Sequence, residues 1–351
     1  MIWLTWRQFR VQFLVVAAVI LAAAIVLAAT GPSLLDDYHR LTDNFIKNLA
    51  LQRLNPLLYQ IGVVLPYVVP PVVGAFWGAP LVARELETGT HRLVWSQSIS
   101  RWRWLAVKLG FTGLGVVAVT GLLSLAVTWW SDPIDDAINA GQESNVYLPR
   151  MFPVTFGARG VVPVGYAAFA FALGVAVGLV IRRTLVALAV TLAAVILIEI
   201  VAPSLVRPQL LAPTDLYVTA SAENIRGFML SGPESDPEVK QIEVASGAVG
   251  AWKLYDRTVD KSGKAVDTLP NWAMGCAPAP PKGIPEPEPR TSAADRNACF
   301  QRLADEGYRQ HIKYFTADKF WALQWREFGL FLGLALLLCG FSFWRIRRDL
   351  S

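Results

Sequence analysis

The chain has 351 residues, of which 54% are hydrophobic and 17% are charged. Soluble proteins carry about 25% charged residues, so this composition excludes a water-soluble protein and indicates a polytopic membrane protein. The formal net charge is +5, but the basic residues cluster beside apolar runs and do not form one stripe. They therefore indicate orientation in a membrane and argue against nucleic-acid binding.

The first 12 residues have an amphipathic pattern. Ile2, Trp6 and Phe9 recur at helical spacing, with polar and basic residues between them, as in a helix that lies in the membrane interface. We predict a cytoplasmic amphipathic helix over 1–12 and a first span from residue 13; a simple basic flank to that span is the alternative. Residues 38–56 are expected to form a loop on the opposite side, either irregular throughout or with a short surface helix.

Two long apolar runs, 61–83 and 104–129, each suffice to cross a bilayer. The turn between them, 84–103, carries an excess of arginine over acidic residues, which marks the cytoplasmic side. The charged residues concerned are Arg84, Arg92, Arg101 and Arg103 against Glu85 and Glu87. Gly89 is expected to end a short helix that continues the second span, and Ser100 to cap the next. The alternative is an ordinary basic hairpin with solvated charges.

Three prolines, Pro66, Pro70 and Pro71, fall inside the second span. Proline removes a backbone donor and kinks a helix, so they predict either a kinked helix lining a pathway or a packing kink without a transport role. Glu199 is the only acidic residue in an apolar run. It is a candidate for a cation or proton contact on a translocation path; the alternative is a contact with interfacial water or with Arg207.

Spans four (162–181) and five (185–202) are separated by the pair Arg182 and Arg183, which predicts a tight cytoplasmic hairpin. Gly174 and Gly178 form a small-xxx-small face for close helix packing. The preceding segment, 131–160, is polar and acidic and is expected to be an outside loop.

Residues 203–325 are predicted to form an extracytoplasmic domain of mixed α+β structure, followed by a sixth span over 326–345 and a tail over 346–351. We expect a hairpin around residues 261–264, a Pro-rich tether over 277–290, and a helix from Ser292 that extends toward Tyr314. Cys276 and Cys299 flank the tether in an oxidising compartment, which predicts a disulfide. Cys339 is expected to be a buried thiol.

Three stretches of the chain resemble bacterial permease subunits of type-2 ABC (ATP-binding-cassette) transporters. They are GAPLVARELETGTHRLVWSQS followed by RWRWLAVKL (78–109), the glycine-containing spans VPVGYAAFAFALGVAVGLVIRRTLVALAVTL (162–192), and YFTADKFWALQWREF (314–328) with its Phe320, Trp321, Gln324 and Glu327. The resemblance implies six transmembrane helices, a bacterial cell-membrane location with both termini cytoplasmic, a second permease chain, identical or homologous, and two copies of an ATPase subunit. It also implies that the 84–103 turn couples to the ATPase, through Arg84, Glu85, Glu87, Gly89, Thr90 and Arg92.

The sequence lacks the motifs of an enzyme. It contains no phosphate-binding loop of the form G-x-x-x-x-G-K-[ST], so ATP and magnesium are expected to bind to the partner ATPase and no cofactor to this chain. The three histidines are scattered, and no metal site or catalytic residue is predicted. The function that the resemblance implies is a permease subunit that exports a drug, peptide or lipid-like substrate. The alternative is a non-transporting membrane protein whose outside domain senses or binds a ligand.

Overall fold

The structure is a computed structural model that describes residues 2–90, 100–221, 223–232, 238–245, 247–276 and 293–349. The chain divides into two compact units, a helical unit of residues 1–211 with 318–351 and a strand-containing unit, Ala212–Ala317.

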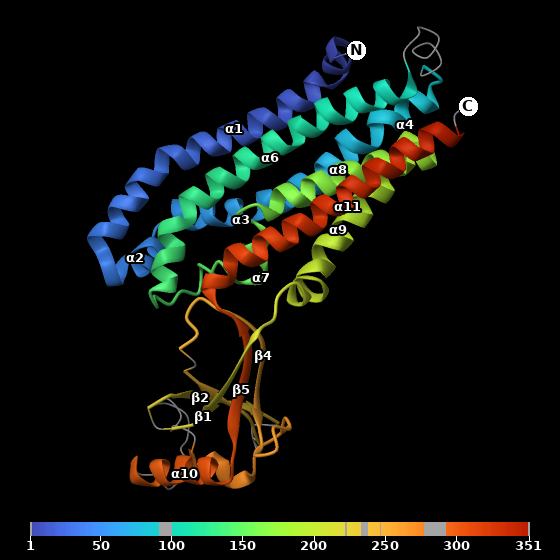
Figure 1. The fold of residues 1–351 in the computed structure, drawn as a ribbon. Coiled ribbons are helices and arrows are strands. Elements are labelled where there is room, and N and C mark those ends of the chain that lie inside the picture. Colours follow the sequence, from blue (N-terminus) through green and yellow to red (C-terminus); the bar gives the residue numbers. More distant parts are fainter. Residues whose placement is uncertain are drawn as a thin grey trace. The chain divides into compact units, whose positions relative to one another are not determined.

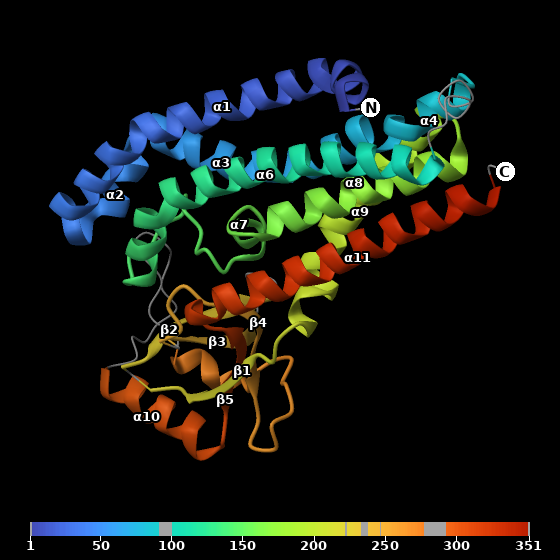
Figure 2. The same cartoon turned by 45° about the horizontal axis from the view of Figure 1, so that its top comes forward.

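The helical unit is a bundle of long, roughly aligned helices (Figures 1 and 2). Six helical segments in the described part of the chain are long and apolar enough to cross a membrane. The elements are α1 (Ile2–Leu41), α2 (Phe45–Leu51), α3 (Leu54–Val72), a π-helical segment (Val73–Gly78), α4 (Ala79–Glu87), α6 (Arg101–Asn139), α7 (Pro153–Gly157), α8 (Val162–Ile181), α9 (Thr184–Leu205) and α11 (Phe320–Asp349).

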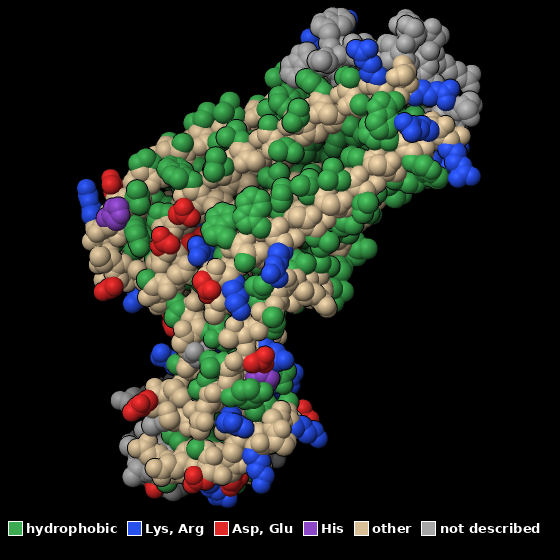
Figure 3. All heavy atoms as spheres, viewed as in Figure 1, with side chains coloured by type: hydrophobic (Ala, Val, Ile, Leu, Met, Phe, Trp, Pro, Cys, Tyr) green, Lys and Arg blue, Asp and Glu red, His purple; other side chains and the backbone are tan. Residues whose placement is uncertain are grey.

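Helix α8 lies at the centre of the bundle, where it packs against α11, α4, α6 and α9. The outer faces of the other long helices carry exposed apolar side chains (Figure 3), such as Leu125, Leu185 and Ile200, which are 69%, 81% and 69% exposed. In water such a surface would aggregate, whereas lipid tails solvate it.

The two ends of the bundle differ in what they carry. The first turn of α1, the end of α4 and the last turn of α11 lie together (Figure 1), and we call this the termini end. The opposite end carries α2 and α7.

Several predicted boundaries are wrong because the helices run further than the apolar segments. Residues 2–12 are not a separate helix but the first turns of α1, which continues without a break to Leu41. The predicted loop over 38–56 contains the end of α1 and the short helix α2, whose Phe45, Ile46 and Leu49 are buried. The predicted loop over 131–160 begins with the last turns of α6, which end at Asn139.

The prolines of the second span do not break it. Helix α3 contains Pro66, Pro70 and Pro71, and the π-helical segment follows directly. Prolines 70 and 71 lack the N–H that would complete the regular hydrogen-bond ladder, and a π-helical turn is one way in which a helix accommodates such an interruption. The prolines predicted a distortion of the second span, but they did not predict that it takes the form of a π-helical segment.

The strand-containing unit spans 212–317, so the predicted domain over 203–325 was too wide at both ends. It holds a three-stranded antiparallel sheet in the order β1 (Thr214–Thr219), β5 (Arg309–Phe315), β4 (Trp252–Val259), and a two-stranded sheet of β2 (Ile225–Ser231) and β3 (Glu238–Val244). The turn near 261–264 is present. In the described residues its two sides are joined by only one isolated antiparallel β-bridge, between Val259 and Ala265.

Helix α10 (Ala293–Asp305) ends well before Tyr314, because β5 takes the following residues into the sheet. Cys276 and Cys299 are disulfide-bonded, with their Cα atoms 5.5 Å apart, and they join the core formed around Ile242, Leu303 and Ile312. Ser292 and the predicted tether over 277–290 lie outside the described residues. Helix α11 begins at Phe320, six residues before the predicted start of the sixth span.

Candidate functional site

The predicted coupling turn, 84–103, begins in the last residues of α4. This helix ends just before Gly89, as the sequence predicted. The amide of Thr88 donates to the carbonyl of Arg84 and that of Gly89 to Leu86, and Gly89 has φ of +72°, a left-handed conformation in which glycine avoids a Cβ clash. Ser100 caps α6 as predicted, because its Oγ accepts from the amide of Arg103 at 3.3 Å. Arg92 lies outside the described residues.

Glu85 points inward from α4. It is 9% exposed, and its Oε1 lies 2.5 Å from Nζ of Lys108 on α6. The same ammonium group donates to the carbonyl of Leu81 at 3.1 Å. A buried, hydrogen-bonded ion pair resists separation, since breaking it leaves an uncompensated charge. Glu85 therefore ties α4 to α6 and is not a surface contact.

Glu87, two residues later, is exposed and reaches a third helix. Its Oε2 accepts from the amide of Thr184 at 2.9 Å and from the Thr184 hydroxyl at 2.6 Å. These are the first backbone amide and side chain of α9, where a carboxylate is favoured by the helix dipole. The end of α4 is thus connected to α6 by one glutamate and to α9 by the other.

A cavity of about 470 Å³ opens beside this end of α4. Its walls come from the start of α1, the π-helical segment, α4 and the turn after it, and Gln12, Arg84, Thr88 and Thr90 are its exposed polar members. The lining residues are Phe9, Gln12, Trp77, Pro80, Leu81, Arg84, Glu85, Thr88 and Thr90.

The second span, which comprises α3, the π-helical segment and α4, crosses α8 so closely that the two backbones are in contact. A Cβ placed on Gly174 would lie 2.2 Å from the Gly74 carbonyl oxygen, and one on Gly178 would lie 2.6 Å from that of Ala79. Only glycine allows such an approach. The packing role predicted for Gly174 and Gly178 is confirmed, and it means that a movement of α4 cannot occur without a response from α8.

Toward the opposite end, Glu199 and two of the three prolines line one small cavity. Pro66, Pro70 and Glu199 meet Tyr67 and Tyr166 around a space of about 10 Å³, which is the size of one water molecule. Pro71 is buried but does not line this space. The candidate path residues are therefore neighbours, apart from Pro71.

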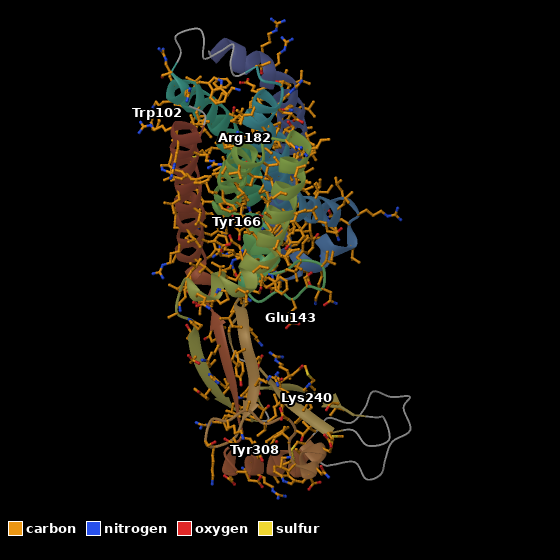
Figure 4. The ribbon with its side chains drawn as sticks, turned by 90° about the vertical axis from the view of Figure 1, so that its right-hand side faces the viewer. Trp102, Glu143, Tyr166, Arg182, Lys240 and Tyr308 are labelled. Atoms are coloured by element: carbon orange, nitrogen blue, oxygen red, sulfur yellow. A yellow bond between two sulfur atoms is a disulfide. The ribbon has the colours of Figure 1, made fainter. Side chains whose placement is uncertain are left out.

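One interpretation of the sequence paired Arg207 with Glu199, but Arg207 pairs with Glu327 instead. Its Nε lies 2.6 Å from Oε2 of Glu327, and its Nη2 lies 3.0 Å from Oε1 of the same carboxylate. Tyr166 donates to that carboxylate at 2.8 Å (its position is labelled in Figure 4). Arg207 and Glu327 are each 1% exposed, so this pair is sealed in the bundle.

Two further buried contacts at the opposite end escaped the sequence analysis. Asp135 and Arg159, both assigned to a polar loop, form a buried ion pair. Gln324 is fully buried and accepts from the amides of Val161 and Val162 at the start of α8. A cluster of charged residues beside a long apolar run was the available signal, but its pairing could not be deduced from separation in the sequence.

The described residues contain no group of histidine, cysteine and acidic side chains that could hold a metal ion. The contacts described above join helices at both ends of the bundle.

Comparison with known proteins gives one clear result. The family description "ABC-2 membrane transporter related" matches residues 15–207, which is more than half of the chain. No curated protein and no solved structure matches the chain. The matched range covers α1 from residue 15, the next four candidate membrane spans, the α4 contacts and the Gly174 and Gly178 crossing. The chain therefore belongs to the ABC-2 membrane transporter related family.

Proposed function

We propose that this chain is the membrane-spanning permease subunit of an ABC transporter, driven by ATP-hydrolysing subunits on separate chains. Family membership supports the transporter class, and the lack of a phosphate-binding loop in the sequence supports a separate ATPase. ATP and magnesium then bind to the partner, of which we expect two copies.

The observation that carries this proposal is the placement of α4. It ends in an exposed turn, is tied to α6 through Glu85 and Lys108, is tied to α9 through Glu87 and Thr184, and crosses α8 at its glycines. A partner that pushes on this turn would displace three spans at once. Rigid contacts of this kind are what the transmission of ATPase closure requires.

The partner-facing groups in this proposal are the exposed ones, Arg84, Glu87 and Thr90, together with the adjoining cavity. Glu85 contributes from inside by holding α4 against α6. Six spans are half of the usual twelve for this class of transporter, so a second permease chain, identical or homologous, completes the assembly.

The orientation follows from charge. Arginines gather at the termini end (Figure 3) and favour its placement in the cytoplasm of a bacterial cell. The strand-containing unit, with its Cys276–Cys299 disulfide, is then extracytoplasmic, in agreement with the oxidising conditions that preserve such bonds.

The substrate path is proposed to pass Glu199. A carboxylate within a membrane span is costly, so its presence there indicates a functional site, and this one lines a small cavity with Pro66 and Pro70. Glu199→Gln should reduce transport of the exported substrate without releasing the ATPase. Unchanged transport at equal expression would remove Glu199 from the path.

Isolation of the tagged permease from its native membrane tests the main proposal. An ATPase with a phosphate-binding loop should co-purify, and ATP hydrolysis by the isolated complex should depend on the permease. If the tagged chain is isolated alone and instead binds an extracellular ligand through residues 212–317, the alternative function, a non-transporting sensor, is supported.

A further inference from the structure

A patch of arginine and tryptophan side chains lies where α6 begins and α11 ends, at the termini end. We call it the α6–α11 seam; it consists of Trp102, Arg103, Phe343, Trp344, Arg347 and Arg348. Trp102 is labelled at the edge of this end in Figure 4. The coupling contacts of α4 do not involve these residues.

The seam is held together by ring contacts. The rings of Trp102 and Phe343 have centroids 4.1 Å apart, which joins the first turn of α6 to the last turns of α11. The Arg347 guanidinium lies 5.0 Å from the Trp102 ring and that of Arg348 lies 5.6 Å from the Trp344 ring. These cation–π contacts fix the direction of both guanidinium groups without neutralising them.

The arginines of the seam make no ion pair with the described side chains. Arg103, Arg347 and Arg348 are exposed, and among the side chains described up to residue 348 none of the ion pairs involves them. The start of α6, a 39-residue helix whose Arg103 amide is already capped by Ser100, adds the positive end of the helix dipole. An anion placed here would meet several donors at once.

The depth of the seam identifies the source of that anion. Both α6 and α11 are candidate membrane spans, and the seam occupies their ends, where a bilayer has its headgroups. Trp102 and Trp344 are 49% and 50% exposed, and half-exposed indole rings with neighbouring arginines are typical of this interface. Basic clusters at the ends of membrane helices bind anionic lipid headgroups.

We propose that the α6–α11 seam binds the headgroup phosphate of an anionic phospholipid. Arg347 and Arg348 donate to the phosphate oxygens, and the two indole rings pack against the glycerol and upper acyl region of the same lipid. The lipid would bridge the first turn of α6 and the last turns of α11. This inference needs only a membrane-spanning chain and does not depend on the proposed ATPase partner.

Lipid retention by the purified full-length protein tests the proposal. The protein is exchanged into bilayers of phosphatidylcholine with a minor fraction of phosphatidylglycerol, re-extracted, and analysed by native mass spectrometry. The wild type should retain phosphatidylglycerol in preference to phosphatidylcholine, and raised salt during extraction should weaken the preference. Absence of any preference would overturn the proposal.

Two double variants are compared. The seam variant carries Arg347→Gln and Arg348→Gln, and the control variant carries Arg182→Gln and Arg183→Gln. Each removes two charges from the termini end, but the second pair lies on the α8–α9 turn and takes no part in the cation–π contacts of the seam. At about 1 kcal/mol for each arginine, the seam variant should bind the anionic lipid roughly 30-fold more weakly, and the control should bind it nearly as the wild type does. Equal losses in both variants would mean unspecific charge attraction and contradict a defined site.

Two further outcomes would also overturn the assignment. If millimolar inorganic phosphate displaces phosphatidylglycerol from the wild type, the seam is a site for a free anion. If the seam variant keeps its lipid but loses a co-purifying protein, the occupant is a protein partner. Wild-type melting behaviour of the variants ensures that the loss of lipid does not reflect unfolding.

Discussion

The two ends of the helical unit use buried ion pairs in different surroundings. At the opposite end, the Arg207–Glu327 and Asp135–Arg159 pairs are sealed, with side chains no more than 3% exposed. At the termini end, Glu85 and Lys108 retain 11% and 6% exposure beside a cavity of about 470 Å³. The same chemistry fixes helices permanently at one end, while at the other it holds a turn that remains accessible to a partner.

The largest effect is expected from the sealed end. Glu327→Ala removes both carboxylate contacts of the buried Arg207 guanidinium, so it should lower the free energy of unfolding by about 3–5 kcal/mol. Thermal unfolding of the detergent-solubilised protein measures the loss. Arg326→Gln, the exposed neighbour on α11, is the control and should change stability by less than about 1 kcal/mol. Equal melting temperatures for the two variants would contradict a sealed pair.

A smaller loss is expected at the termini end. Lys108→Met leaves the Glu85 carboxylate without its ammonium partner, and we expect a loss of about 3 kcal/mol because some water still reaches Glu85. The double change Glu85→Gln with Lys108→Met should recover most of that stability, since no buried charge remains. A double variant as unstable as the single one would mean that the pair is not the source of the effect. Coupling to the ATPase should stay impaired in both variants.

The helix crossing gives a third effect. Gly174→Ala places a methyl group 2.2 Å from the Gly74 carbonyl oxygen, so the helices must separate, at a cost of about 1–3 kcal/mol. Gly110→Ala on α6 meets nothing within 4 Å and should stabilise its helix by up to about 1 kcal/mol. Opposite signs for these two substitutions, measured by thermal unfolding, would confirm the close crossing. A stabilising Gly174→Ala would contradict it.

The smallest effect concerns the strand-containing unit. A hydrogen bond with Nε2 of His311, at 2.7 Å, holds the pKa of Asp215 below its usual value. Because the folded-state pKa is the lower one, this contribution to stability is complete above about pH 4 and is lost as the pH falls through the folded-state pKa. Asp215→Asn should reduce the acid sensitivity of hydrogen exchange in β5. An unchanged acid profile would mean that the contact does not contribute.

Local rules in the sequence were sufficient for several features of the site. Gly89 and Ser100 were identified from the conformations that helix ends require, and both behave accordingly. The close crossing at Gly174 and Gly178 followed from the spacing of small residues. Each of these inferences needs only residues that are neighbours along the chain.

Features that depend on distant partners could not be derived in this way. Helix α6 continues through Asp135 because Arg159, 24 residues later, pairs with that carboxylate. Arg207 finds Glu327 across 120 residues, in preference to Glu199 nearby in the sequence. The segment after α10 was predicted to be helical, but pairing of β5 with β1, almost 100 residues away, makes it a strand. Tertiary pairing overrides local propensity at each of these positions.

A pull-down with two permease variants tests whether the ATPase binds at the termini end. A tagged permease carrying Arg84→Glu and Glu87→Lys, which reverse two exposed charges of the α4 turn, is compared with one carrying Arg326→Glu at the opposite end. We expect both variants to fold and only the α4 variant to lose the ATPase and permease-dependent hydrolysis. Full retention of the ATPase by the α4 variant, or its loss from the Arg326→Glu variant, would contradict the account.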